Sequence, residues 1–256
     1  MISANTLFHF TSSIDNLRSI LTNHFSPRYS LENIGFLSKK ESIDIAIPMV
    51  CFCDIPLSQI IDHVNVYGEY AVGLTKDWAI RNGISPILYL YFESNTMKFI
   101  PEFFKTSTIF AKIRKEISGK DSNSEVKSLL RFMCHCKDYE GSMWRNGEKI
   151  DRVLYNENEW RYVPYLDPLE YPDLELFITS KIFNSKETMN QFNTRLSNCK
   201  IVFTPNDIKY IVISKESERS DFIKMIELVK GSDYNPDELK LLNSKIISVE
   251  NIKEDF

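Results

Sequence analysis

Short apolar runs alternate with amphipathic stretches along this chain, but the two kinds of segment follow no regular rhythm. The runs at 6–10, 47–56 and 70–75 are typical of short strands. The stretches at 12–25 and 57–68 carry apolar residues at helical spacing. A parallel sheet with regular crossovers needs an even alternation of strand and helix, so this irregular order favours the α+β class. We therefore expect mixed or antiparallel central sheets with flanking helices.

The same patterns predict the rest of the chain. Further strands are expected at 86–92, 153–164, 201–203 and 208–214, and further helices at 76–83, 217–231 and 236–244. Residues 26–36 are expected to form an ordered loop, and about 97–136 a helical insertion with a loose polar section at 118–125. No repeat or low-complexity stretch divides residues 1–256, so one domain with C-terminal helices over 217–256 is the simplest organisation.

Composition excludes several classes of function. With 43% hydrophobic and 26% charged residues, the chain has the balance of an ordinary globular protein. Its net charge of −4 gives no global field that would attract nucleic acid or an anionic membrane. It contains neither an apolar run of about 20 residues nor a secretory signal, so no membrane partner is expected.

The numbers and positions of cysteine and glycine limit the cellular compartment and the kinds of cofactor site to be expected. Five cysteines, an odd number, indicate a reduced, cytoplasmic protein. None of the 8 glycines forms a G-x-G-x-x-G or Walker A loop, which disfavours a Rossmann cofactor site and a P-loop. Cys51-x-Cys53 and Cys134-His135-Cys136 could in principle hold zinc, but their spacing departs from C-x₂₋₄-C. Buried free thiols are therefore expected, and no metal.

The run 153–164 carries the most informative polar residues. Because side chains alternate across a strand, Glu157, Glu159 and Arg161 should share one face. The other face is expected to pack on the core through Leu154, Trp160 and Tyr162. Two interpretations remain open for the charged face. It is either a solvated surface on which arginine offsets two acids, or the wall of a cleft where a glutamate stabilises a developing positive charge.

His9 lies inside the first apolar run. On a strand it shares a face with Thr11, and the two side chains could together bind a ligand hydroxyl. The alternative is a core histidine bonded to a backbone carbonyl.

The block 51–73 adds further polar candidates. Asp54 follows a strand and precedes a helix, where it can contact a ligand or cap that helix. Tyr67 and Tyr70 can line a cleft or serve as core aromatics with a hydrated hydroxyl.

Several blocks together resemble the AbiGi family of bacterial abortive phage-infection proteins. They are "LFHFTSSIDNLRSIL", "FSPRYSLENI", "IPMVCFCDIPLSQIIDHVNVYGEYAVGLTKDWAI", "KDYEGSMW", "NENEWRYVP" and "FTPNDIKYIVISKESE". They run in order from residue 7 to about 218, and the block at 47–80 is the most specific of them. This resemblance implies a role in phage defence and a cognate toxin or antitoxin protein as partner.

The layout also resembles, more distantly, the ADP-ribosyltransferase fold. Members with a His-Tyr-Glu type of site carry a histidine on the first strand, matched by His9, and a glutamate on a late strand, matched by Glu159. Glu157 completes a Glu-x-Glu pair. The middle position of that site, an aromatic residue, departs from the pattern. Phe52 occupies the strand where a tyrosine would be expected, and Tyr67 lies on the helix after that strand.

The transferase resemblance implies a set of functional residues. Glu159, His9 and Tyr67 would be catalytic, because a carboxylate lowers the barrier to an oxocarbenium-like centre and a histidine fixes the ribose. NAD⁺ would be a substrate, with Arg28 on its pyrophosphate. The implied NAD⁺-binding residues are His9, Thr11, Arg28, Phe52, Asp54, Tyr70, Glu157 and Arg161.

Three functions follow, of which the first is the leading expectation and the other two are alternatives to it. The first is a toxin-like ADP-ribosyltransferase that moves ADP-ribose from NAD⁺ to RNA or protein during abortive infection. The second is a catalytically inactive partner, such as the antitoxin of a two-gene toxin–antitoxin module, in which the fold persists without the NAD⁺ site. The third is a binding domain that uses the Glu157–Arg161 face as a protein interface.

Overall fold

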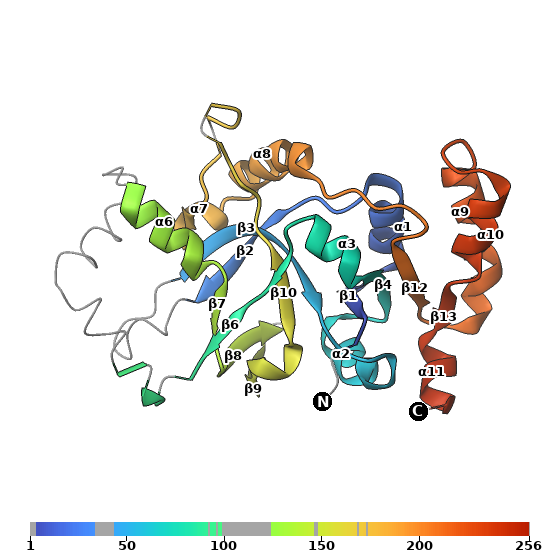
Figure 1. Cartoon of the computed structure of the whole chain (residues 1–256), viewed down its shortest axis with the longest axis horizontal. Coiled ribbons are helices and arrows are strands. Elements are labelled where there is room, and N and C mark those ends of the chain that lie inside the picture. The colour runs from blue at the N-terminus through green and yellow to red at the C-terminus, as the bar shows by residue number, and fades with distance from the viewer. Residues whose placement is uncertain are drawn as a thin grey trace.

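A mixed sheet with helices on both faces organises the molecule (Figure 1). The computed structural model describes residues 4–33, 44–91, 93–95, 97–98, 124–145, 148–167, 169–172 and 174–255. Within these residues the main sheet has nine strands, with β13-β12-β4-β1-β3-β10-β5 in order and β2 and β11 also paired to β3. Strands β12 and β13 are parallel, whereas the other pairs of this sheet are antiparallel. The α+β class with a mixed sheet is confirmed.

The strands are mostly short. Those of the main sheet are β1 Thr6–Thr11, β2 Arg28–Asn33, β3 Asp44–Cys53, β4 Tyr70–Thr75, β5 Ser85–Pro86, β10 Glu159–Tyr162, β11 Ile178–Thr179, β12 Ile208–Ile213 and β13 Ile246–Ser248. Two further pairs stand apart from it: β6 Leu88–Leu90 with β7 Cys136–Asp138, and β8 Glu140–Arg145 with β9 Glu148–Val153.

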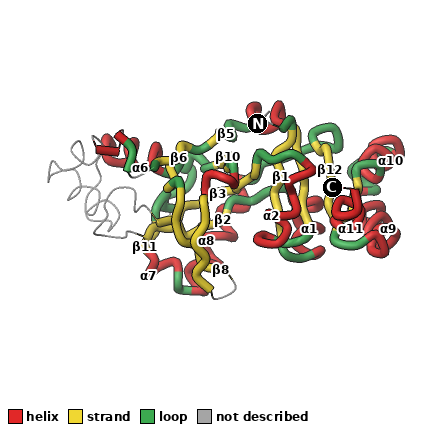
Figure 2. The backbone as a smooth tube through the Cα atoms, turned by 90° about the horizontal axis from the view of Figure 1, so that it is seen from below, coloured by secondary structure: helices red, strands yellow, loops and turns green. Residues whose placement is uncertain are grey.

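The helices flank the sheet and gather at its ends. They are α1 Ile14–Asn23, α2 Ile60–Tyr67, α3 Lys76–Arg81, α6 Ser124–Met133, α7 Ser180–Phe183, α8 Lys186–Leu196, α9 Arg219–Lys230, α10 Pro236–Asn243 and α11 Val249–Asp255. Seen from below, α9, α10 and α11 lie at one end of the molecule and α6 at the other (Figure 2). No described helix combines the length and apolar character that crossing a bilayer requires.

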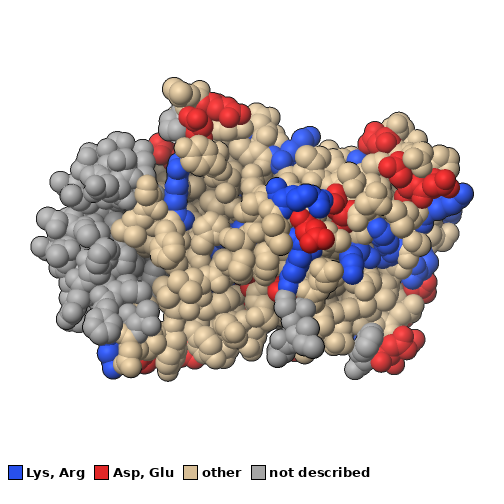
Figure 3. All heavy atoms as spheres, in the orientation of Figure 1, with Lys and Arg blue, Asp and Glu red and all other residues tan. Residues whose placement is uncertain are grey.

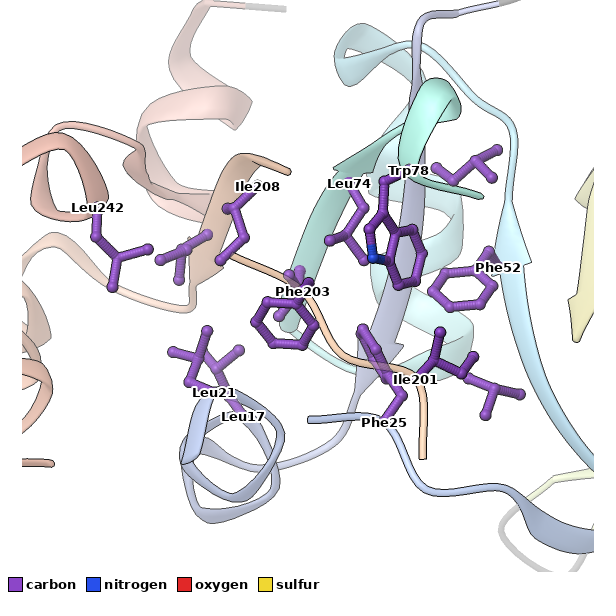
Figure 4. Close-up of a cluster of buried hydrophobic side chains, with 14 of the residues drawn as sticks. Leu17, Leu21, Phe25, Phe52, Leu74, Trp78, Ile201, Phe203, Ile208 and Leu242 are labelled. Atoms are coloured by element: carbon purple, nitrogen blue, oxygen red, sulfur yellow. The ribbon is translucent and has the colours of Figure 1, made fainter. Parts of the chain in front are cut away.

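One face of the sheet packs against α1, α3, α9 and α10. Leu17 and Leu21 of α1, Trp78 of α3 and Phe52 of β3 meet in this cluster (Figure 4). Phe25 lies between them, with its ring 5.2 Å from that of Phe52. Burial of these large apolar side chains is the main force that holds the helices on this face.

The opposite face of the sheet carries α2 and α11. Phe8 of β1 and Val212 of β12 pack there against Ile60 and Val64 of α2 and Ile252 of α11. Helix α2 ends at Tyr67 because Gly68, at φ +118°, turns the chain into β4 through a backbone conformation that favours glycine.

Most predicted elements are confirmed, with four corrections. Residues 26–36 are not a loop throughout, because 28–33 form β2. The predicted strand 86–92 is divided into β5 and β6, and 201–203 makes only an isolated bridge between Ile201 and Phe25. The predicted strand 153–164 is also broken: β9 ends at Val153, a 3₁₀ helix spans Leu154–Glu157, and β10 begins at Glu159. Most of the predicted insertion 97–136 and of its polar section 118–125 lies outside the described residues; α6 occupies 124–133.

Candidate functional site

The break in the predicted strand 153–164 places two carboxylates side by side. Asn158 adopts a left-handed conformation with φ +44° and ψ +51°, which ends the 3₁₀ helix and starts β10. Asparagine tolerates this conformation better than most residues. Glu157 and Glu159 therefore flank the turn, and both reach the same ammonium group, that of Lys137 on β7.

Five side chains form what we call the buried charge cluster: Glu32, Lys137, Glu157, Glu159 and Arg161. Lys137 Nζ lies 2.8 Å from Glu157 Oε2 and 2.9 Å from Glu159 Oε2. Arg161 Nε donates to Glu159 Oε1 at 2.7 Å, and its Nη2 lies 3.3 Å from Glu32 Oε2. The guanidinium also donates from Nη1 to the Cys134 carbonyl at 2.7 Å.

Both interpretations of the charged face need correction, because this face is neither solvated nor open. Glu157 is 3% exposed, Glu159 4% and Arg161 0%. Each carboxylate oxygen of the two glutamates has a partner, since the Tyr67 hydroxyl donates to Glu157 Oε1 and the other three oxygens accept from Lys137 or Arg161. In this arrangement the charge of Glu159 is neutralised by protein cations, and the cluster ties β2, β7 and β10 together.

The electrostatics hold Glu159 and Lys137 of the cluster in their ionised forms. Burial alone would raise the pKa of Glu159, but Arg161 and Lys137 outweigh it and lower this pKa to about 2. Burial would likewise lower the pKa of Lys137, yet Glu159, Glu32 and Glu157 hold it well above its ordinary value. These groups therefore stay charged across the physiological pH range.

Asp138, beside the cluster, provides a pH-dependent prediction. Partial burial, with Glu32 as a second cause, raises its pKa to about 6. The Asp138 carboxyl group then holds its proton more tightly in the folded chain than in the unfolded chain. Its ionisation therefore lowers the free energy of unfolding as pH rises from about 4 to 6. Since Asp138 is partly exposed, we expect Asp138→Asn to raise the free energy of unfolding by only about 1–2 kcal/mol at pH 7.5.

Urea unfolding at several pH values measures the effect of Asp138→Asn. Its gain over the wild-type chain should shrink below about pH 4, where the aspartate is protonated in both states. Asp221→Asn is the matched control, because that side chain is 87% exposed, and it should change little at any pH. A gain for Asp138→Asn that is independent of pH would contradict the assignment.

The register of the sheet separates His9 from Glu159. Phe8 of β1 and Glu159 of β10 both lie opposite Cys53 of β3, so these three residues point to one face. His9 is the next residue of β1 and points to the other face, together with Phe52. The predicted meeting of His9 and Glu159 in one cleft is wrong, because they lie on opposite sides of the same sheet.

His9 itself fits the second interpretation given above, a histidine of the core that is bonded to a backbone carbonyl. Its Nδ1 lies 2.8 Å from the carbonyl oxygen of Cys51, and its ring contacts those of Phe25 and Phe52 at 5.1 and 5.7 Å. Burial lowers the pKa of the imidazole, against a smaller opposing effect of the bond to Cys51. His9 is thus a half-buried ring whose Nδ1 binds a backbone carbonyl.

The other predicted residues are distributed over several environments. Tyr67 reaches Glu157, whereas the Tyr70 hydroxyl donates to Glu218 Oε1 at 3.1 Å. Asp54 does not cap a helix; it pairs with Lys76 Nζ at 2.6 Å.

Three further predicted residues lie outside the cluster. Thr11 is buried at the end of β1, Phe52 is fully buried in the core, and Arg28 is exposed at the start of β2. The structure thus brings Tyr67, Glu157, Glu159 and Arg161 together, and leaves His9, Thr11, Arg28, Phe52, Asp54 and Tyr70 elsewhere. The NAD⁺-binding roles of these residues stay predictions.

Three members of the site were missed at the sequence level. Lys137 and Glu32 complete the ion pairs, and the Tyr89 hydroxyl accepts from the Glu159 backbone N–H at 2.9 Å. The available signal was the excess of two glutamates over one arginine in 157–161, which requires another cation once these residues are buried. Nothing in the sequence selects Lys137 over the other cations.

The cysteines form no metal centre in the described part of the chain. All five thiols are free, and no group of three or more described His, Cys, Asp or Glu side chains is arranged to hold a metal ion. Burial, partly offset by Arg161, raises the pKa of Cys134 to about 12 and that of Cys136 to about 11, so both remain thiols.

Comparison with known proteins places the chain in a family. The family model described as "Putative abortive phage resistance protein AbiGi, antitoxin" matches residues 23–214. The chain is also similar to the "Abortive phage resistance protein AbiGi" of Lactococcus lactis subsp. cremoris, with 33% identity over 253 residues, 91% of this chain and 99% of that protein. No solved structure matches it, so the ADP-ribosyltransferase fold stays a prediction. This chain belongs to the AbiGi family of abortive phage resistance proteins.

Proposed function

We propose that this chain is the antitoxin of an abortive-infection module, a non-catalytic protein that binds a toxin protein encoded beside it and holds that toxin inactive. The description of the matching family as an antitoxin supports this function. The observation that carries it is the sheet register, because the histidine and the glutamate that a transferase would need in one cleft lie on opposite faces.

The buried charge cluster gives independent support. A carboxylate that stabilises a developing positive charge must present an oxygen to the reacting group. Both oxygens of Glu159 instead bind Arg161 and Lys137. A satisfied, buried network of this kind suits a rigid scaffold better than a catalytic centre.

Expression in bacteria tests the proposal. The chain alone should be harmless, and it should restore growth when it is co-expressed with a toxic product of the neighbouring gene. His9→Asn, whose amide can still donate to the Cys51 carbonyl, should restore growth as well as the wild-type chain does. In parallel, the purified chain with labelled NAD⁺ and cell lysate should transfer no label.

The opposite results in these expression and labelling tests would favour the ADP-ribosyltransferase function. Toxicity of the isolated chain, together with label transfer that disappears in Glu159→Gln and His9→Asn, would overturn the antitoxin function. Chasing that label into RNase-sensitive or protease-sensitive material would then identify the acceptor as RNA or protein.

A further inference from the structure

His24 follows the last residue of α1 in a backbone conformation that is unusual for a residue with a side chain. Its φ is +66° and its ψ is −170°. Helices often end at such a position with a glycine, which has no Cβ to clash with the backbone. A histidine in this conformation is strained, and such strain persists only where the surrounding structure compensates for it. The buried charge cluster lies elsewhere, so the contacts of His24 itself must supply this compensation.

The ring of His24 provides the acceptor for a backbone amide of a distant segment. The Phe203 N–H donates to His24 Nδ1 at 3.4 Å, and the two rings meet edge to face at 4.9 Å. Phe203 is 3% exposed, and a buried amide that loses its acceptor is destabilising. Nδ1 can accept this bond only while it carries no hydrogen. The bond therefore requires the neutral imidazole whose proton is on Nε2.

The amide belongs to residues 201–203, which are held to the core by two further attachments. Ile201 and Phe25 exchange two backbone hydrogen bonds, at 2.8 and 3.3 Å, and the indole N–H of Trp78 donates to the Val202 carbonyl at 2.8 Å. Figure 4 shows Phe25 and Ile201 close together within the core cluster. Of these three attachments, the bond to the histidine is the one that depends on a group titrating near neutral pH.

The surroundings of the ring oppose its protonation. Burial lowers the pKa of His24, and the cations Lys230 and Lys200 lower it further, against the opposing effect of Asp233. Lys230, at the end of α9, is itself buried and donates to the Thr22 carbonyl at 3.2 Å and to Asp233 at 3.1 Å. On the face shown in Figure 3, basic and acidic atoms mix over the end of the molecule that holds α9 and α10, so this face has no field of one sign to outweigh these neighbours.

We propose that His24 is an acid-sensitive latch, which holds residues 201–203 to the end of α1 while its ring is neutral and releases them when the ring is protonated. A protonated Nδ1 carries a hydrogen, so it would face the Phe203 N–H as a second donor. The new positive charge would also lie beside Lys230 and Lys200, with Asp233 as the nearby carboxylate. This device goes beyond the antitoxin function and does not rest on it.

Nitrogen NMR of the histidine rings in the wild-type chain tests the latch in its closed state. At pH 7.5 His24 should be the tautomer with its proton on Nε2, because Nδ1 accepts from the Phe203 amide. The ring should titrate below 6.5, the ordinary pKa of histidine. A proton on Nδ1 at pH 7.5, or a titration midpoint at or above 6.5, would overturn the proposal without any substitution being made.

Amide hydrogen exchange, read residue by residue, tests the release. As pH falls below about 6.5, the protection factor of the Phe203 amide should fall by up to about tenfold per pH unit, because opening takes up one proton. Leu74, fully buried on β4 between β1 and β12, reports global unfolding and should keep a higher protection factor. Equal protection of the two amides at every pH would mean that the chain opens as a whole, and the latch would be wrong.

Two variants assign the effect to His24. In His24→Asn the side chain tolerates a positive φ but does not titrate, so the protection factor of the Phe203 amide should change little between pH 7.5 and 5. The matched control is His135→Asn, because burial also lowers the pKa of His135, which lies beyond α6 at the other end of the molecule. It should keep the pH dependence of the wild-type chain. A pH dependence that survives in His24→Asn, or that disappears in His135→Asn, would contradict the latch.

Discussion

Replacing Arg161 with methionine should lower the free energy of unfolding by about 3–5 kcal/mol, the largest effect expected of any single substitution in the buried charge cluster. Arg161 is fully buried and interacts with Glu159, Glu32 and the Cys134 carbonyl. Methionine fills much of the same space, but it leaves Glu159 with Lys137 as its remaining cation and the Cys134 carbonyl without this donor.

Urea unfolding at pH 7.5 measures the loss from Arg161→Met. The matched control is Arg81→Met, because Arg81 makes an ion pair with Asp207 at 2.6 Å while 62% of its side chain is exposed. A surface pair of this kind contributes at most about 1 kcal/mol. Equal losses in the two variants would show that the buried charge cluster does not hold β2, β7 and β10 together.

The pH dependence of Arg161→Met gives a second, independent check. A carboxyl whose pKa is lowered on folding stabilises the protein above its unfolded pKa, and this stabilisation is lost as pH falls through the folded value. For Glu159 that value is about 2. The difference between wild-type chain and variant should therefore narrow as pH falls from about 5 towards 2.

Elements with a clear apolar pattern could be predicted from sequence, and elements without one could not. Strands β1, β3 and β4 and helices α1, α2 and α9 follow their periodicity, since each buries a continuous face or run. Strand β2 was missed because Tyr29 is its one buried side chain, and backbone pairing with β3 defines it rather than apolar alternation.

The site shows a different limit of prediction. Glu159 and Arg161 were expected on one face, and they form an ion pair on one face. The side of the sheet that His9 occupies relative to Glu159 depends on how β1 and β10 align with β3, and a shift of one residue would reverse it. The residue pattern of β1 or β10 does not determine how that strand aligns with β3. The sequence resemblance to a histidine–glutamate site therefore could not show that His9 and Glu159 lie on opposite faces of the sheet.

Gly68→Ala should lower the free energy of unfolding by about 2–5 kcal/mol, through backbone strain and steric overlap together. Gly68 has φ +118°, which an alanine rarely adopts. A Cβ added there would lie 2.4 Å from the Thr11 carbonyl oxygen and 2.5 Å from the Ser12 Cα. Both are backbone atoms at the end of β1, so neither can move aside as a flexible side chain would.

Gly83→Ala is the matched control for Gly68→Ala, because Gly83 also has a positive φ, +69°, but an added Cβ would meet no atom within 4 Å. Gly83→Ala introduces backbone strain but no steric overlap, so it should lower the free energy of unfolding by about 1 kcal/mol. Thermal and urea unfolding of both variants separate the effect of backbone strain from that of steric overlap. Since Gly68 directly follows Tyr67, which binds Glu157, the overlap should also displace the end of α2 from the buried charge cluster. Equal losses in the two variants would mean that the contact of Gly68 with the end of β1 contributes nothing beyond its backbone angle.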